Sequence, residues 1–315
     1  MSAKFGARAM LPFFLTRKSL KVLVLIINAV VFFWYFLFGN VPLTHALDVV
    51  RLHAPHSEKD VRHIYPRVLL KEALQKTVPT YGPYRIEQSI EGMQRDRALQ
   101  QMVYGKKINV IVAVTRAEWE TETIPVRIPL LKGLLGYRLF LIRQDNQYLF
   151  DAIHDIAQVK VLKAGLRQQW STTKALDQLG FLIVTGSSYE GLFRMLSQRR
   201  FDYFPRGVNE IFSEFEAHKA EFPDLAIESS LALYLPSPSY FFVSPANPEL
   251  AKRIETGLLM MIEDGTFDKI FYEFQGDNIE RAGLSKRKIL RVDNPILPEN
   301  TPFSHKEFWY MPTGE

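Results

Sequence analysis

The feature that most constrains the fold is a strand-length apolar run that directly follows a helix and its glycine cap. Residues 96–104 have a helical pattern, Gly105 is suited to end the helix, and residues 108–114 are almost continuously apolar. Such a run is typical of a strand buried on both faces of a sheet. With the expected strand at 49–52 and the expected helix at 65–77, it predicts an α/β fold.

A second series of alternating elements begins after residues 137–142. The expected elements are a helix at 149–156, a strand at 159–166, a helix at 171–179, a strand at 181–184, a helix at 188–197, a strand at 201–204, a helix at 208–220 and a strand at 239–243. Amphipathic helices at 248–262 and 267–274 complete the series. The tail from Asn294 is rich in Pro and aromatic residues, which favours an ordered strap over a helix.

The net charge of +5 is confined to the amino terminus. The first 46 residues hold five basic and no acidic side chains, so the remainder carries 34 basic and 34 acidic residues. A folded part with no net charge has no global field to attract a polyanion, which excludes nucleic acid as a partner.

The first 46 residues have the pattern of an export signal. A basic cluster precedes the apolar run 22–38, helix-ending residues come next, and residues 44–46 form a passable cleavage site that ends in Ala46. An uncleaved membrane anchor is the alternative, although a cleaved signal is favoured. Either interpretation places the folded part outside the cytoplasm, and the absence of cysteine excludes disulfides and a lipidated-cysteine tether. We therefore expect a free periplasmic protein.

No residue pattern indicates catalysis, a metal or a cofactor. Ser187 and Ser188 lack the glycines of a hydrolase elbow and are better explained as helix caps. His53, His56 and His63 cluster near the first strand, but no cysteine or metal-binding helix motif supports them as ligands.

Four stretches carry a family resemblance. They are the helix-to-strand step 105–113, residues 124–130 with 136–138, the helix–strand step 189–203, and residues 248–250 with the Asp-Gly-Thr-Phe-Asp-Lys-Ile run at 264–270. In this order they resemble the family-3 extracellular solute-binding proteins of the polar amino-acid type. The resemblance covers roughly residues 47–276 and is most specific in the fourth stretch.

The resemblance implies a two-lobed periplasmic-binding-protein-like (type II) fold with two crossing strands. Lobe 1 would comprise residues 47–141 plus 240–315, and lobe 2 residues 142–239. A small polar solute would hold the lobes closed by hinge motion. The family also implies a monomer whose partner is an inner-membrane transporter permease. A sensory or accessory protein that reports ligand to a membrane sensor is the alternative.

The resemblance also suggests ligand-binding positions. Trp170, Ser171, Thr172 and Thr173 match the family's anion-holding turn at a helix start, with Trp170 in place of its glycine; simple helix capping is the alternative. Thr115 opens the stretch where the family carries its carboxylate-clamping arginine. Here Trp119 occupies that arginine's position, and Arg116 lies three residues earlier.

Arg206 follows the expected strand 201–204, near where the family places an aspartate for the ligand's amino group. An arginine there reverses the local charge and favours an anionic ligand. The alternative is a structural arginine paired with an acid such as Glu210.

Overall fold

The computed structural model describes residues 24–29, 47–54, 63–89 and 95–312. The chain divides into two compact units, Met1–His45 and Ala46–Glu315, and the second contains all the strands of the described part. The expected export signal and its cleavage site lie almost entirely outside the described residues. Within the described part, no helix is both long and apolar enough to cross a membrane.

Two mixed sheets, each flanked by helices, make up the second unit, and each defines one lobe. The lobe 1 sheet has the order β2-β1-β3-β11-β4. Its strands are β1 (Asp48–Leu52), β2 (Tyr84–Gln88), β3 (Val110–Val114), β4 (Ile124–Val126) and β11 (Ser239–Val243). β11 returns from lobe 2 and runs antiparallel between β3 and β4. This return completes lobe 1 with residues from two distant parts of the chain.

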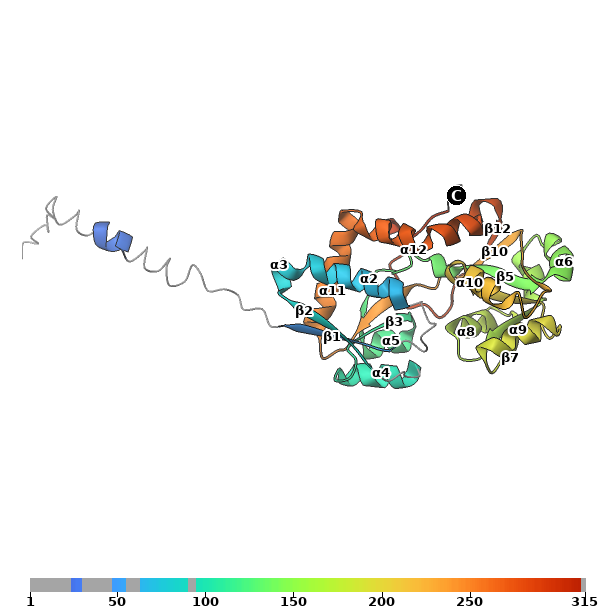
Figure 1. Cartoon of the computed structure of the whole chain (residues 1–315), viewed down its shortest axis with the longest axis horizontal. Coiled ribbons are helices and arrows are strands. Elements are labelled where there is room, and N and C mark those ends of the chain that lie inside the picture. Colours follow the sequence, from blue (N-terminus) through green and yellow to red (C-terminus); the bar gives the residue numbers. More distant parts are fainter. Residues whose placement is uncertain (1–23, 30–46, 55–62, 90–94, 313–315) are drawn as a thin grey trace, which may run out of the picture. The chain divides into compact units, whose positions relative to one another are not determined.

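Helices cover both faces of the lobe 1 sheet (Figure 1). They are α2 (Ile64–Lys76), α3 (Val78–Tyr81), α4 (Arg95–Tyr104), α5 (Ala117–Glu122), α11 (Pro248–Glu263) and α12 (Thr266–Ala282). One face packs on α4 and α5, with Met102, Trp119 and Phe242 at its centre. The other packs on α2 and α11 through residues such as Leu69 and Ile254. A sheet covered on both faces explains the near-continuous apolar run at 108–114.

The lobe 2 sheet has the order β12-β10-β5-β8-β6-β7, and β9 pairs with β5. Its strands are β5 (Tyr137–Arg143), β6 (Lys163–Arg167), β7 (Leu182–Gly186), β8 (Tyr203–Gly207), β9 (Leu225–Ile227), β10 (Leu231–Tyr234) and β12 (Lys288–Arg291). Its helices are α6 (Gln147–Asp151), α7 (Ile156–Lys160), α8 (Ser171–Gln178), α9 (Tyr189–Ser197) and α10 (Val208–His218). Short 3-10 turns are η2 (Leu134–Gly136), η3 (Gln144–Asn146), η4 (Leu284–Lys286) and η5 (Lys306–Phe308).

The sheets correct two details of the expected lobe division. The expected lobe 1 includes residues 137–141, but these form most of β5 in the lobe 2 sheet. It also includes residues 288–291, yet they form β12, which pairs in parallel with β10. The chain therefore crosses between lobes again after α12, so the part after residue 240 does not belong to lobe 1 alone.

Several expected elements differ in their bounds from the structure. The helix expected at 149–156 is α6, Gln147–Asp151, and the helix expected at 267–274 is the longer α12, Thr266–Ala282. The expected strand 159–166 begins as helix α7, which Asp155 and Gln158 start with a reciprocal capping box; the strand comes later, at Lys163–Arg167. The expected strand 201–204 lies further along, as β8, and includes Pro205 and Arg206. A proline is tolerated there because β6 pairs with β8 only at Tyr203, so no strand on that side needs the missing N–H.

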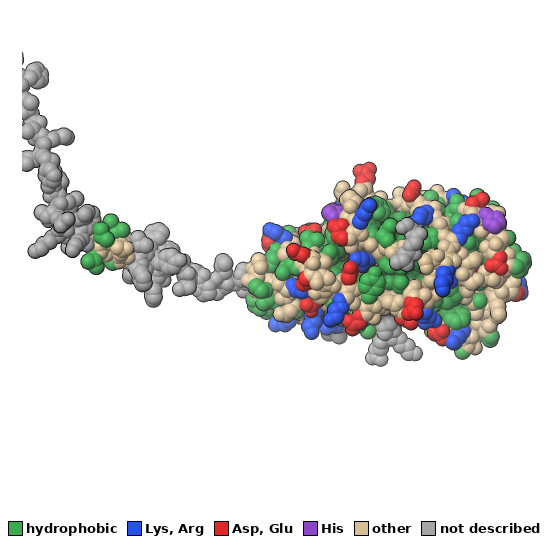
Figure 2. Space-filling model, turned by 90° about the horizontal axis from the view of Figure 1, so that it is seen from above, with side chains coloured by type: hydrophobic (Ala, Val, Ile, Leu, Met, Phe, Trp, Pro, Cys, Tyr) green, Lys and Arg blue, Asp and Glu red, His purple; other side chains and the backbone are tan. Residues whose placement is uncertain are grey.

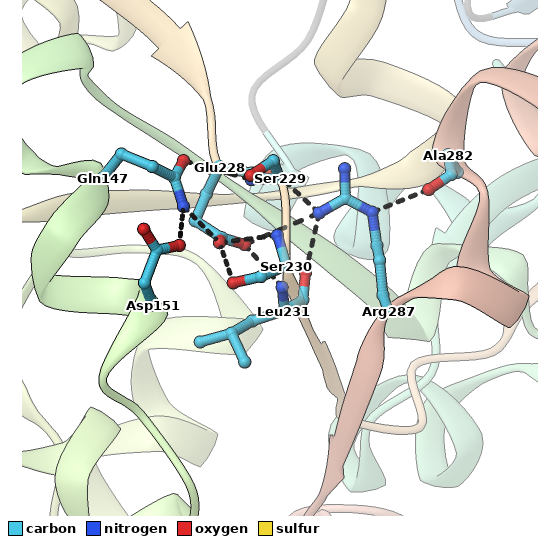
Figure 3. Close-up of polar contacts among 8 residues, drawn as sticks. All are labelled: Gln147, Asp151, Glu228, Ser229, Ser230, Leu231, Ala282 and Arg287. Atoms are coloured by element: carbon cyan, nitrogen blue, oxygen red, sulfur yellow. Dashed lines mark hydrogen bonds and ion pairs between the residues drawn. The ribbon is translucent and has the colours of Figure 1, made fainter.

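A network around a buried carboxylate joins the segment before β12 to lobe 2 (Figure 3). Glu228 is fully buried and accepts hydrogen bonds from the Ser230 and Leu231 N–H groups, the Ser230 hydroxyl and Gln147 Nε2. Arg287, just before β12, lies 3.5 Å from Glu228 and donates to the carbonyls of Glu228 and Leu231. This network ties the turn between β9 and β10 to the segment after α12.

The C-terminal strap, defined as residues 292–312, then runs back along the two segments that cross between the lobes, 127–136 and 235–238. Asn294 Nδ2 donates to the carbonyl oxygen of Pro236 at 2.7 Å. At the other end, the Tyr310 N–H donates to the Lys132 carbonyl oxygen at 2.7 Å, and Lys132 Nζ donates to the carbonyl oxygen of Glu307. The strap contains no α-helix among its described residues. Through these hydrogen bonds it contacts both crossing segments.

Candidate functional site

Thr115 directly follows β3, which leads into α5. Its N–H donates to the carbonyl of Pro238 in the second crossing segment. Its hydroxyl donates to Glu120 Oε1 at 2.6 Å, and Arg127 donates twice to the other oxygen of Glu120, at 2.7 and 3.1 Å. Thr115 is buried, so it positions the beginning of α5 beside a crossing segment.

Arg116 and Trp119, both predicted to contact ligand, have different surroundings. Arg116 is the N-cap residue of α5, with extended backbone, and its Nε lies 3.8 Å from Glu118 Oε2. Trp119 is fully buried and packs its ring 5.5 Å from that of Phe242 in the lobe 1 core. Trp119 thus fills the core, while Arg116 stays partly exposed at the helix start.

The predicted anion-holding turn is the first turn of α8, and the capping alternative does not hold for Ser171. The N-cap residue is Trp170, which provides no side-chain cap, and Ser171 is the first helical residue. The hydroxyl of Thr173 donates to the carbonyl of Arg167 at 2.6 Å. The Thr173 N–H donates to the Trp170 carbonyl at 3.1 Å, which leaves the N–H groups of Ser171 and Thr172 without a partner within the helix. This turn therefore has the form of an acceptor-binding site.

One ion pair links the two lobes at these predicted residues. Lys174 Nζ in α8 lies 3.8 Å from Glu118 Oε1 in α5, whose other oxygen faces Arg116. The Lys174 and Glu118 side chains are 60% and 53% exposed, so solvent screening leaves this pair little energy. The contact is informative about geometry, because it shows that the start of α5 and the start of α8 face each other. Sequence reasoning missed both residues in this role.

Arg206 does not follow β8 but lies within it, almost completely buried. It donates through Nε and Nη2 to the two oxygens of Glu214, at 2.6 and 2.5 Å, and lies 3.1 Å from Glu210 Oε2. The Trp170 ring stacks on Phe204, and the Arg206 guanidinium lies 4.8 Å from the Trp170 ring. The pairing with Glu210, which the sequence left as the alternative, is present.

Burial and the two nearby carboxylates determine the pKa of Arg206. Burial alone would lower the pKa of Arg206, but Glu210 and Glu214 outweigh it, so the pKa is raised above its usual range. Burial, assisted by Glu214, also raises the pKa of Tyr189. Arg206 therefore stays charged, and most of its donors already have carboxylate partners.

One of the two serines considered for catalysis has a structural role. Ser188 caps α9 by accepting from the Gly191 N–H at 3.1 Å. Among the described residues, no group of three or more His, Asp or Glu side chains could hold a metal ion. His56 lies outside the described residues. Figure 2 shows Lys and Arg side chains interspersed with Asp and Glu on the face it presents, without a single-sign surface for a polyanion.

Comparisons with known proteins establish the fold. No family model and no curated protein matches the chain. An ancestral arginine-binding protein bound to arginine is similar in structure, with a TM-score of 0.51 and 18% identity over 72% of this chain and 97% of that one. A periplasmic His/Glu/Gln/Arg/opine family-binding protein from Silicibacter pomeroyi, in complex with lysine, has a TM-score of 0.50 and 13% identity, covering 72% and 97%.

A third structure, from work on glutathione import through the cystine ABC importer of Streptococcus mutans, has a TM-score of 0.50 and 14% identity, covering 73% of this chain and 96% of that one. At these identities the likeness concerns the fold. The chain has the two-lobed α/β fold of the periplasmic binding proteins, as the sequence predicted.

Proposed function

We propose that this protein is a solute-binding protein that captures a small polar solute, anionic or amino-acid-like, between its two lobes. The observation that carries the proposal is that the starts of α5 and α8 face each other. Arg116 supplies a cation from lobe 1, and the first turn of α8 supplies backbone N–H groups from lobe 2. An anionic group held by both would favour closure, because only the closed arrangement offers both sets of donors.

Delivery to an inner-membrane importer from the periplasm is the role that we propose for the captured solute. The apolar run and passable cleavage site in the first 46 residues support export, and the likeness to a periplasmic binding protein and to a protein of an import system supports transport. A sensory protein that reports ligand to a membrane partner is the second candidate. This second role is favoured by Trp119. It occupies the position of the arginine that clamps the ligand carboxylate in the family, yet its side chain lies in the core. Neither role requires a catalytic step.

A thermal-shift screen of the chain from residue 47 onward tests the proposal. The panel contains amino acids, monocarboxylates, dicarboxylates, phosphate esters and sugars. A solute at about 100 times its Kd adds about 2.7 kcal/mol, which raises the Tm by about 5–10 °C in a protein of this size. A panel without a single shift would refute solute binding and favour the protein-partner interpretation.

The Arg116→Met variant then locates the site. We expect this variant to bind the solute identified in the screen about 10- to 100-fold more weakly, because it loses one charge-assisted hydrogen bond. Calorimetric titration measures the affinity. Arg194→Met is the matched control, because Arg194 is exposed and pairs loosely with Glu221 at 3.9 Å. Equal affinities for the two variants would show that the start of α5 does not contact the solute.

A further inference from the structure

Helix α12 packs against both lobes (Figure 1). On the lobe 1 side, the Phe274 ring lies 5.4 Å from that of Tyr65 in α2. About two turns later, the Arg281 guanidinium lies 4.4 Å from the Phe212 ring in α10 of lobe 2, and its Nη2 lies 3.5 Å from Glu216 Oε1. One helix thus contacts both lobes, so a change in the angle between the lobes must move α12 against α2 or against α10.

The C-terminal strap is a second link of this kind. It begins directly after β12 of the lobe 2 sheet, and Asn294 Nδ2 donates to the Pro236 carbonyl oxygen of the second crossing segment at 2.7 Å. Lys132 Nζ, in the first crossing segment, donates to the Glu307 carbonyl oxygen of the strap at 2.9 Å and to Asp268 Oδ1 of α12 at 2.6 Å. The strap therefore starts in lobe 2, contacts both crossing segments and meets α12 at Lys132.

The strap is attached where the backbone of the first crossing segment is most unusual. Lys132 and Gly133 have φ angles of 47° and 73°, in the left-handed region that few residues other than glycine adopt. The Trp309 ring packs directly on Gly133, where a Cβ would lie 2.5 Å from Trp309 Cε3, and the Tyr310 N–H donates to the Lys132 carbonyl oxygen. Lobes rotate about a few connecting residues that absorb large changes in φ and ψ. The strap thus contacts the residues of this segment that are best placed to act as the hinge.

We propose that α12 and the C-terminal strap together form a brace that restricts hinge motion and holds the lobes at the angle at which the starts of α5 and α8 face each other. Two crossing segments alone can bend without losing contacts between the lobes, whereas the brace must lose its contacts with α10 or with the crossing segments. The Lys174–Glu118 pair is too exposed to hold the lobes by itself. The brace acts on the chain without solute, so this inference does not depend on the proposed function.

Double electron–electron resonance between one nitroxide label in each lobe tests the brace, in the chain from residue 47 onward and without solute. The chain contains no cysteine, so the labels attach only at Glu122→Cys and Gln178→Cys, the exposed last residues of α5 and α8. The brace variant combines Lys132→Ala, Arg281→Ala and Asn294→Ala, which remove contacts with the first crossing segment, α10 and the second crossing segment. We expect its distribution of label-to-label distances to be about twofold wider than with the brace intact, and to extend to longer distances.

The matched control combines Lys269→Ala, Arg194→Ala and Asn300→Ala, the same residue types at exposed positions. We expect it to keep the narrow distribution of the labelled protein with an intact brace. Thermal unfolding shows whether each variant is folded. If the brace variant does not fold, Arg281→Ala with Asn294→Ala, against Arg194→Ala with Asn300→Ala, makes the same comparison with fewer contacts removed.

Three outcomes would overturn the inference. Distances in the brace variant as narrow as those in the control would show that these contacts do not restrict the hinge. A broad or two-peaked distribution with the brace intact would show that the lobes already move freely. A lower Tm in the brace variant with unchanged distances would assign the contacts to stability alone. None of these outcomes bears on solute binding, which the thermal-shift screen tests separately.

Discussion

Arg206→Ala should destabilise the protein by about 3–5 kcal/mol, a loss on the order of 10 °C in Tm. The sequence alone suggests that Arg206 contacts ligand, in which case its removal would affect binding and leave stability unchanged. The structure changes this expectation, because Glu210 and Glu214 both face Arg206 in a nearly buried site. Without the guanidinium, two carboxylates would remain there with their main cation removed. Equilibrium urea unfolding measures the loss.

The control for this prediction is Arg194→Ala, which removes an exposed arginine and should change the free energy of unfolding by no more than about 0.5 kcal/mol. A triple variant, Arg206→Met with Glu210→Gln and Glu214→Gln, should recover much of the stability, because no charged partner is left unpaired. An unchanged Tm in Arg206→Ala, together with lost solute binding, would instead support the ligand-contacting role.

Glu228→Ala should also cost about 3–5 kcal/mol, because the fully buried carboxylate accepts from two backbone N–H groups, a hydroxyl and an amide. Calorimetric unfolding gives the loss. Because Arg287 connects this carboxylate to the segment before β12, Glu228→Ala should also speed proteolytic cleavage near the C terminus.

Glu221→Ala is the matched control, since Glu221 is 63% exposed and lies 3.9 Å from Arg194 in a loose surface pair. We expect neither the Tm nor the cleavage rate to change in this variant. If Glu228→Ala lowers the Tm but leaves C-terminal cleavage unchanged, Glu228 stabilises the turn between β9 and β10 without holding the segment before β12.

The periodic parts of the fold were predictable from sequence because burial on one or both faces leaves a direct pattern. The expected strand 239–243 has the bounds of β11, and the helix expected at 171–179 matches α8 to within one residue. The start of β6 was harder to predict, because the neighbouring α7 is also short and the two segments have similar composition. The capping box at Asp155 determines where α7 begins. The assignment of β12 to lobe 2 depends on a long-range pairing that no local pattern contains.

The candidate site was less predictable, because a side chain's role depends on its partners in space. The structure places Arg116 and Ser171 on facing helix starts, as a binding site between lobes requires, but Trp119 in the core. A signal for the Arg206 cluster was present in the sequence: Glu210 and Glu214 are four residues apart and share one face of a helix.

β11 and β12 come late in the sequence but join sheets whose other strands come earlier, and this has a consequence for folding. The lobe 1 sheet lacks the strand between β3 and β4 until residues 239–243 are made, and the lobe 2 sheet lacks an edge until residues 288–291 are made. Long-range strand pairing of this kind slows folding, because a large loop must close before the contact forms. The chain therefore cannot complete either lobe during early synthesis. We expect this late completion to prolong the unfolded state, which suits the export that we propose if the chain passes the membrane through a channel that admits only unfolded chains.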